Sequence, residues 1–200
     1  MPTSLPTLIS LPAAVYSAII LFCVKEFLEW RRRRGADARK LSVYKRVLAH
    51  ECERNYWLIK VLRDLASGGQ QWETPYRITT EASGRQSWGF YDPNGTLARG
   101  GSLPKVKLDT IERLAVEVAY VDGLLAEKVR EALDSVLELQ HLRNSAVDYG
   151  NDQPGGHISA GDLQEGFFDY ALSELEDHYK SLSKLYLACT GKELRQHRLR

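Results

Sequence analysis

Cysteine is scarce in this chain, which has three cysteines in 200 residues. Cys23, Cys52 and Cys189 lie far apart, and the sequence has no Cys-x-x-Cys motif and no Cys/His spacing typical of metal ligands. A disulfide framework needs paired cysteines, and a structural zinc site needs four clustered ligands. The composition therefore argues against a disulfide-rich secreted domain and a zinc module. It predicts reduced, structural thiols.

Charged residues are missing from the first 24 positions of the chain. Within this stretch, Leu5 to Val24 reads LPTLISLPAAVYSAIILFCV, twenty residues without one Lys, Arg, Asp or Glu. A helix rises about 1.5 Å per residue, so twenty residues cover the roughly 30 Å hydrocarbon core of a bilayer. The sequence predicts a single transmembrane helix, with the lipid bilayer as its partner.

Two alternatives exist for this stretch. A cleaved signal peptide would have a positively charged start and a small-x-small cleavage site, whereas residues 1–10 are uncharged and Cys23-Val24-Lys25-Glu26-Phe27 follows the apolar run. A core helix of a soluble protein would normally keep a polar face, and this run is apolar on every face. A retained anchor is the interpretation that the residues favour.

Basic residues follow the apolar run immediately. Residues 25–46 contain nine Lys or Arg against three acidic residues. Positive flanks stay on the cytoplasmic side of a membrane, so we expect the N-terminus outside and residues 31–200 in the cytoplasm, as in a single-pass inner-membrane protein. Contact with anionic headgroups is expected for the nearest cations, at about 1 kcal/mol each: Lys25, Arg31, Arg32, Arg33, Arg34, Arg39 and Lys40.

The rest of the chain is mildly acidic. Residues 47–200 carry a net charge of −5, although the whole chain carries +1. A nucleic-acid-binding face requires a basic patch, so we expect no nucleic-acid partner. The sequence divides into residues 1–34, an anchor with its basic flank, and residues 35–200, a cytoplasmic helical domain.

Hydrophobic periodicity indicates the fold of that domain. Apolar residues at three- and four-residue steps predict helices over 41–66, 109–146 and 162–189. Between the first two, residues 72–108 are rich in β-branched and aromatic residues around the turn Asp92–Gly95, which predicts two or three short strands. The predicted fold class is mainly α: a transmembrane helix followed by a bundle of three long helices with a small antiparallel β-meander insertion.

The stripe from Ile111 to Ala146 extends over about 60 Å if it is one helix, and it approximates a heptad. One domain of this size needs only part of such a stripe for its own core. The sequence therefore predicts self-association, a coiled-coil-like homo-oligomer involving Leu139 and Leu142, or a foreign protein partner on the same surface.

The aromatic residues of the β insertion form a second candidate partner surface. These are Tyr76, Trp88, Phe90 and Tyr91. A small β-ribbon is marginally stable alone, so the alternative is that these rings pack against the helices of the same chain. Packing within the chain is the interpretation that we favour.

Few residues suggest chemistry, and Glu138, His141 and Arg143 are the strongest of them. Glu138 and His141 form a Glu-x-x-His pair, as in di-iron bundles, but the second such pair is missing. His141-Leu142-Arg143-Asn144 resembles part of the Arg-polar-x-x-x-His motif of HEPN ribonucleases, with Asp148 where that motif has histidine. We therefore predict no cofactor, no metal and no catalysis, and we place Arg143 and Asp148 in surface or interhelical charge pairs.

The sequence thus favours a membrane-anchored scaffold that acts through protein contacts or self-association. A membrane-perturbing oligomeric effector, of toxin or defence type, is the first alternative. A HEPN-like or metal-dependent enzyme with a degenerate motif is the second.

Overall fold

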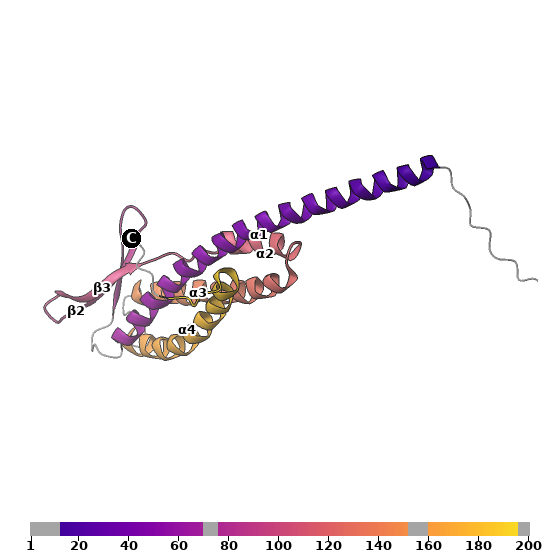
Figure 1. Ribbon diagram of the computed structural model, residues 1–200. Helices are drawn as coiled ribbons and strands as arrows, with labels where there is room; N and C mark the ends of the chain where they lie inside the picture. The colour runs from indigo at the N-terminus through magenta and orange to yellow at the C-terminus, as the bar shows by residue number, and fades with distance from the viewer. Residues whose placement is uncertain (1–12, 70–75, 152–159, 196–200) are drawn as a thin grey trace, which may run out of the picture. The chain divides into compact units, whose positions relative to one another are not determined.

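The computed structural model describes residues 13–69, 76–151 and 160–195. The chain divides into two units, Met1–Ser42 and Val43–Arg200. The described residues are mainly helical and include a small antiparallel sheet of three strands (Figure 1). The prediction of a mainly α chain with a small β insertion is therefore confirmed.

The first helix, α1, runs without interruption from Ala13 to Gly69. Gly35 lies within it, and nothing packs within 4 Å of the position that its Cβ would occupy. A single glycine costs a helix only about 1 kcal/mol, so the backbone hydrogen bonds continue through it. The predicted helices on the two sides of Gly35 are one helix, which ends at Gly69, three residues after the predicted helix over 41–66.

The sheet consists of β1 (Arg77–Thr80), β2 (Gln86–Tyr91) and β3 (Leu97–Leu103), in the order β1-β2-β3. Asp92 closes the second hairpin, because its Oδ1 accepts hydrogen bonds from the backbone N–H groups of Asn94 and Thr96. This is the turn that the sequence predicts. Tyr76 precedes β1, and its hydroxyl donates to the Ala146 carbonyl of the third helix, which fixes the sheet to the bundle.

The predicted helix over 109–146 is wrong, because the structure has two helices there. They are α2 (Asp109–Ala119) and α3 (Gly123–Asn151). Asp122 caps α3, since its Oδ1 accepts a hydrogen bond of 3.0 Å from the Leu125 N–H. A side-chain N-cap of this kind is worth about 1 kcal/mol and starts a new helix after the turn.

The last helix, α4, extends from Ala160 to Thr190, so it begins two residues before Asp162, the start of the predicted helix. Gly191 ends it with a positive φ of 70°, and its N–H donates to the Leu187 carbonyl. Only glycine adopts this left-handed conformation without strain. The sequence also predicts a glycine-rich loop over residues 150–161, and most of it lies outside the described residues.

The core of the second unit lies between the helices and one face of the sheet. The second half of α1 packs on α4: the rings of Tyr56 and Tyr179 are 5.2 Å apart, and the Tyr186 hydroxyl donates to Glu53 at 3.0 Å. The fully buried side chains come from every helix and from the sheet region. They include Leu48, Leu58, Ile59, Leu65, Tyr76, Phe90, Ile111, Leu139, Leu142, Leu175, Leu182 and Leu185.

Candidate functional sites

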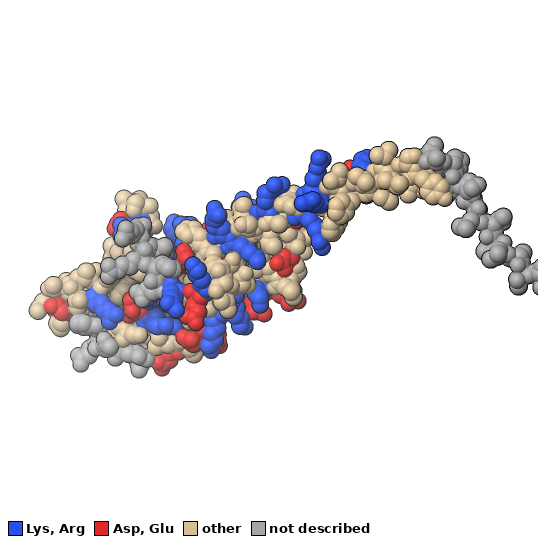
Figure 2. All heavy atoms as spheres, viewed as in Figure 1, with Lys and Arg blue, Asp and Glu red and all other residues tan. Residues whose placement is uncertain are grey.

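The N-terminal part of α1 exposes large apolar side chains on every face. Within Met1–Ser42, four consecutive residues from Ile19 to Phe22 are each between 50% and 69% exposed. Consecutive helical residues point about 100° apart, so four of them surround the helix axis. In Figure 2 the segment is an almost unbroken tan surface that ends at a group of blue cations. We call residues 13–30 the apolar segment.

Interactions along the helix organise the polar end of this segment. Glu29 pairs with Lys25 at 4.0 Å and with Arg33 at 3.6 Å, one turn away on each side. The guanidinium of Arg34 lies 4.3 Å from the centre of the Trp30 ring. The acidic Glu29 at the polar end of the apolar segment is thereby paired with cations, and a tryptophan is held against a cation, as at a membrane–water interface.

No helix among the described residues combines the length and the apolarity that crossing a membrane requires. Residues 13–24 carry no charge, and they span about 18 Å of helix. The first eight residues of the predicted span, 5–12, lie outside the described part of the chain.

The aromatic residues of the β insertion pack within their own chain. Tyr76, Trp88 and Phe90 are each at most 6% exposed, and Tyr91 is half-buried. Tyr76 contacts Phe90 and, at 5.6 Å between ring centres, Phe168 of α4. A partner surface made of Tyr76, Trp88 and Phe90 is therefore wrong for this structure, and the favoured alternative of packing on the bundle describes it.

The three residues considered for chemistry are not brought together. Glu138 and His141 are exposed on α3, whereas Arg143 is buried. His141 and Arg143 are two residues apart and therefore point about 200° apart around the helix. Within the described part of the chain, no three His, Cys, Asp or Glu residues form a group that could hold a metal ion.

Arg143 does not form the charge pair that the sequence suggested. Its Nε donates to the Pro104 carbonyl at 2.8 Å, and its Nη2 donates to the side-chain oxygen of Gln86. Both of these acceptors are neutral groups, a backbone carbonyl and a side-chain amide. Burial lowers the pKa of Arg143 below its usual value. Arg143 is only 7% exposed, so its positive charge is held in the interior. No carboxylate of the described residues forms an ion pair with it.

This guanidinium lines a cavity of about 300 Å³, which we call the Arg143 cavity. The connection between β3 and α2 forms one wall. It is held on both sides, by Arg143 at Pro104 and by Asn55 of α1, which exchanges two hydrogen bonds of 3.0 Å with the backbone of Lys107. The cavity is lined by Gly84, Gln86, Lys105, Val106, Gln140 and Arg143.

Sequence reasoning singled out Arg143 but none of the other residues of this cavity. They come from the β1–β2 turn, the start of β2, the connection after β3, and α3, up to 59 positions apart. They form no sequence motif. Glutamine is a common surface residue, so Gln86 and Gln140 give no signal of a site in the sequence. Arg143 lies four residues after Leu139 and three before Ala146, so it falls on the apolar stripe of the helix. An arginine at such a position is the one sequence signal that could have pointed to the cavity.

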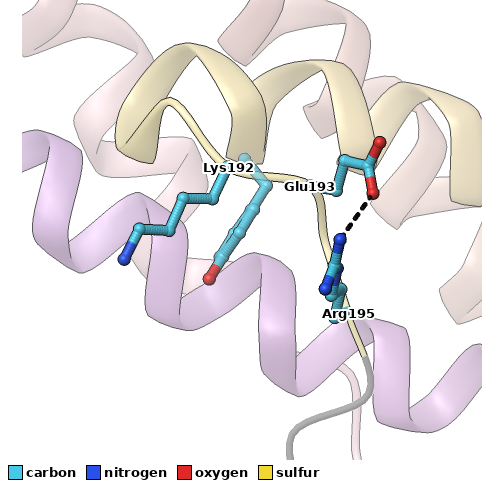
Figure 3. A pocket seen from close by; sticks show the side chains of 4 residues that line it. Lys192, Glu193 and Arg195 are labelled. Atoms are coloured by element: carbon cyan, nitrogen blue, oxygen red, sulfur yellow. Dashed lines mark hydrogen bonds and ion pairs between the residues drawn. The ribbon is translucent and has the colours of Figure 1, made fainter.

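A second cavity, of about 360 Å³, lies at the end of α4 (Figure 3). It is lined by Tyr186, Lys192, Glu193 and Arg195. Its arginine is already paired, because Arg195 Nη2 lies 3.4 Å from Glu193 Oε2, the dashed contact in the figure. Exposed pairs of this kind contribute little, and the cation is neutralised within the cavity. The Arg143 cavity is therefore the better candidate for a ligand.

His178 of α4 is buried, and its Nε2 has no hydrogen-bond partner among the described residues. Burial lowers its pKa below 6.5, although the carboxylates of Glu174, Glu138 and Asp177 act in the opposite direction. The folded protein therefore prefers the neutral imidazole. Because the unfolded chain binds this proton more tightly, the contribution of His178 to stability is complete above pH 6.5 and falls as the pH drops below that value.

Replacing His178 with glutamine is expected to reduce the loss of stability between pH 7 and pH 5. The neutral amide of glutamine does not bind a proton in this pH range. The part of the stability loss that comes from protonation of His178 in the unfolded chain is therefore absent from the variant. Urea unfolding at a series of pH values measures this difference, with the exposed His141→Gln as the matched control. Equal pH dependence in wild type and His178→Gln would contradict the assignment.

Exposed apolar residues also surround the turn between α2 and α3. Val116, Tyr120 and Leu124 are 62%, 87% and 77% exposed. Tyr44, in the first turn of the second unit, hydrogen-bonds through its side chain to Glu117 of α2, which raises the pKa of the tyrosine. We call Val116, Tyr120 and Leu124 the α2–α3 corner, and the interaction of Tyr44 with Glu117 holds α2 beside the first turn of the second unit. Sequence analysis missed this corner, because it assigned these residues to one continuous helix.

No protein-family model, curated protein or solved structure matches this chain.

Proposed function

We propose that this protein is a membrane-anchored interaction protein whose helical body acts through protein contacts or self-association. The observation that supports it most is the apolar segment, which exposes large aliphatic and aromatic side chains around the whole helix. Leaving each such side chain in water forgoes about 1.5–3 kcal/mol of burial. A bilayer removes all faces from water at once, which one protein surface on one side of the helix does not.

The anchor in this proposal is the uncharged stretch from residue 5 to residue 24, of which the described α1 supplies the second part. Lys25, Glu29 and the cations Arg31–Arg34 then lie at the headgroup level. The excess of cations on this side supports an orientation with residues 31–200 in the cytoplasm and the N-terminus outside. Such cations gain about 1 kcal/mol each at an anionic surface.

The α2–α3 corner is the surface that we assign to protein contacts. Exposed apolar residues that lie close together often mark an interaction site, whereas single exposed apolar residues are normal on a protein surface. The stripe from Ile111 to Ala146 no longer supplies this surface, because Leu139, Leu142 and most of its other members are buried within the chain. Anchoring in one membrane raises the effective concentration of identical corners, which favours a homo-oligomer over a foreign partner.

Replacing Tyr120 and Leu124 with glutamate is expected to dissociate this homo-oligomer while leaving the fold intact. Both side chains are more than three-quarters exposed, so charge is tolerated in the monomer and repelled in an interface. Sedimentation velocity of the full-length protein in detergent measures the change, and Leu187→Glu on α4, 51% exposed, is the matched control. A wild-type protein that is already monomeric at micromolar concentration would contradict self-association and direct the search to a co-purifying protein.

A further inference from the structure

The Arg143 cavity contains a cation whose charge the described residues leave uncompensated. Removing a guanidinium from water costs several kcal/mol unless an anion and further hydrogen bonds offset the loss. Arg143 is 93% buried by accessible area, and the two acceptors described for it are the Pro104 carbonyl and the Gln86 amide oxygen. Two neutral hydrogen bonds satisfy two of its five N–H groups. The remaining donors and the charge itself have no anionic partner among the described residues.

The other residues that line the cavity add to its excess of positive charge. Lys105 contributes a second cation, and Gln140 contributes an amide whose Nε2 donates to Asn144 Oδ1 at 2.8 Å. The described lining residues include no Asp or Glu. Gly84, which has a φ of 75° in the β1–β2 turn, also lines the cavity and has no side chain to fill it.

We propose that the Arg143 cavity binds a phosphate group, with Arg143 and Lys105 as its two cationic contacts. Arginine presents a planar array of donors that matches two phosphate oxygens, and lysine adds a point charge. The cavity volume, about 300 Å³, lies at the lower end of small-molecule sites, which suits a phosphomonoester with a small organic part. Because the connection from Pro104 to Lys107 is already held by Arg143 and Asn55, ligand binding requires little ordering of this wall.

Inorganic phosphate is the probe for the first experiment, with the full-length protein in detergent. We expect phosphate to raise the melting temperature saturably relative to chloride at equal ionic strength, since a ligand that binds only the folded state stabilises it. Lys105→Ala should weaken the apparent affinity about tenfold, the loss of one charge-assisted contact. Arg143→Lys should weaken it by a similar factor, and Arg143→Gln should abolish the response.

Lys192→Ala is the matched control, because Lys192 is an exposed lysine that lines the other cavity. It should leave the phosphate response unchanged. If Arg143→Gln does not fold, the exposed Lys105 still decides the matter. Equal stabilisation by phosphate and chloride, or an unchanged phosphate affinity in Lys105→Ala, would overturn the proposal.

The phosphate group could belong to a soluble ester or to a lipid headgroup, and competition distinguishes the two. Glycerol phosphate and phosphatidylcholine vesicles containing phosphatidic acid are compared as competitors for the inorganic phosphate site. Competition by the soluble ester alone assigns a soluble ligand, and competition by the vesicles assigns a headgroup. A failure of both competitors, with inorganic phosphate bound, would overturn the assignment to a phosphomonoester. None of these outcomes depends on the anchor, so they are separable from a failure of the proposed function.

Discussion

Aspartate at both Ile19 and Ile20 is expected to release the full-length protein from the membrane fraction into the supernatant. An aspartate near the centre of a membrane-spanning helix costs about 2.5–3.5 kcal/mol. The two positions are consecutive, so they point about 100° apart and no rotation of the helix turns both away from lipid. The two aspartates together cost about 5–7 kcal/mol, and each 1.4 kcal/mol is a factor of ten, so the partition should change by roughly 4,000- to 100,000-fold.

Membrane fractionation followed by an alkaline carbonate wash measures this partition. Val43→Asp is the matched control, because Val43 is 59% exposed on the same helix and lies beyond the cations from Arg31 to Lys40. We expect the control to remain in the washed membranes. If the double aspartate variant also remained there, the apolar segment would not be the anchor.

Alanine at Leu139 is expected to lower the free energy of unfolding by about 2–5 kcal/mol. Leu139 is fully buried on α3, so the substitution loses burial and leaves a cavity that the bundle fills only in part. Leu137 lies two residues earlier on the same helix and is 47% exposed. Leu137→Ala should therefore change the free energy of unfolding by less than about 1 kcal/mol. Urea unfolding of both variants at neutral pH provides the comparison.

The outcome at Leu139 also decides what the apolar stripe of α3 does. If the stripe were an interface between copies, Leu139→Ala would dissociate an oligomer and leave the unfolding midpoint of the monomer unchanged. The structure predicts the reverse, a less stable chain with an unchanged oligomeric state. Dissociation without a loss of stability would contradict the packing of α3 described here.

The sequence was sufficient for most elements of the fold and failed at one junction. Local signals were strong at Asp92–Gly95 and at Gly191, where turn chemistry and a positive φ require particular residues. At Val121-Asp122-Gly123 the same kind of signal was present, an N-cap aspartate before a glycine. The apolar period continued across this point, because α2 and α3 both face the same core, and the periodicity concealed the break.

The interior of the second unit was predicted less well than its outline, for a physical reason. Hydrophobic period indicates which side chains are buried, and Tyr76 and Phe90 followed that rule once the sheet was packed on the bundle. The environment of Arg143 instead depends on Pro104 and Gln86, which lie 39 and 57 positions away along the chain. Neither forms a motif with the arginine, so only the folded structure brings the three together.

The most direct test of the anchor compares two alanines, Ala18 within the apolar segment and Ala38 beyond Arg31–Arg34. Both are exposed on the same helix, so equal reactivity is expected if both lie in water. Each would be changed to cysteine, Ala18→Cys or Ala38→Cys, in a chain carrying Cys23→Ser, Cys52→Ala and Cys189→Ser. A charged maleimide would then be added to sealed inside-out membrane vesicles.

We predict that the Ala38→Cys protein is labelled rapidly and that the Ala18→Cys protein stays unlabelled. Shielding of the latter should persist in concentrated urea, which unfolds a protein partner but leaves a helix in lipid covered. Equal labelling of both proteins in intact vesicles would show that the apolar segment lies in water, and it would contradict the membrane-anchored protein proposed here.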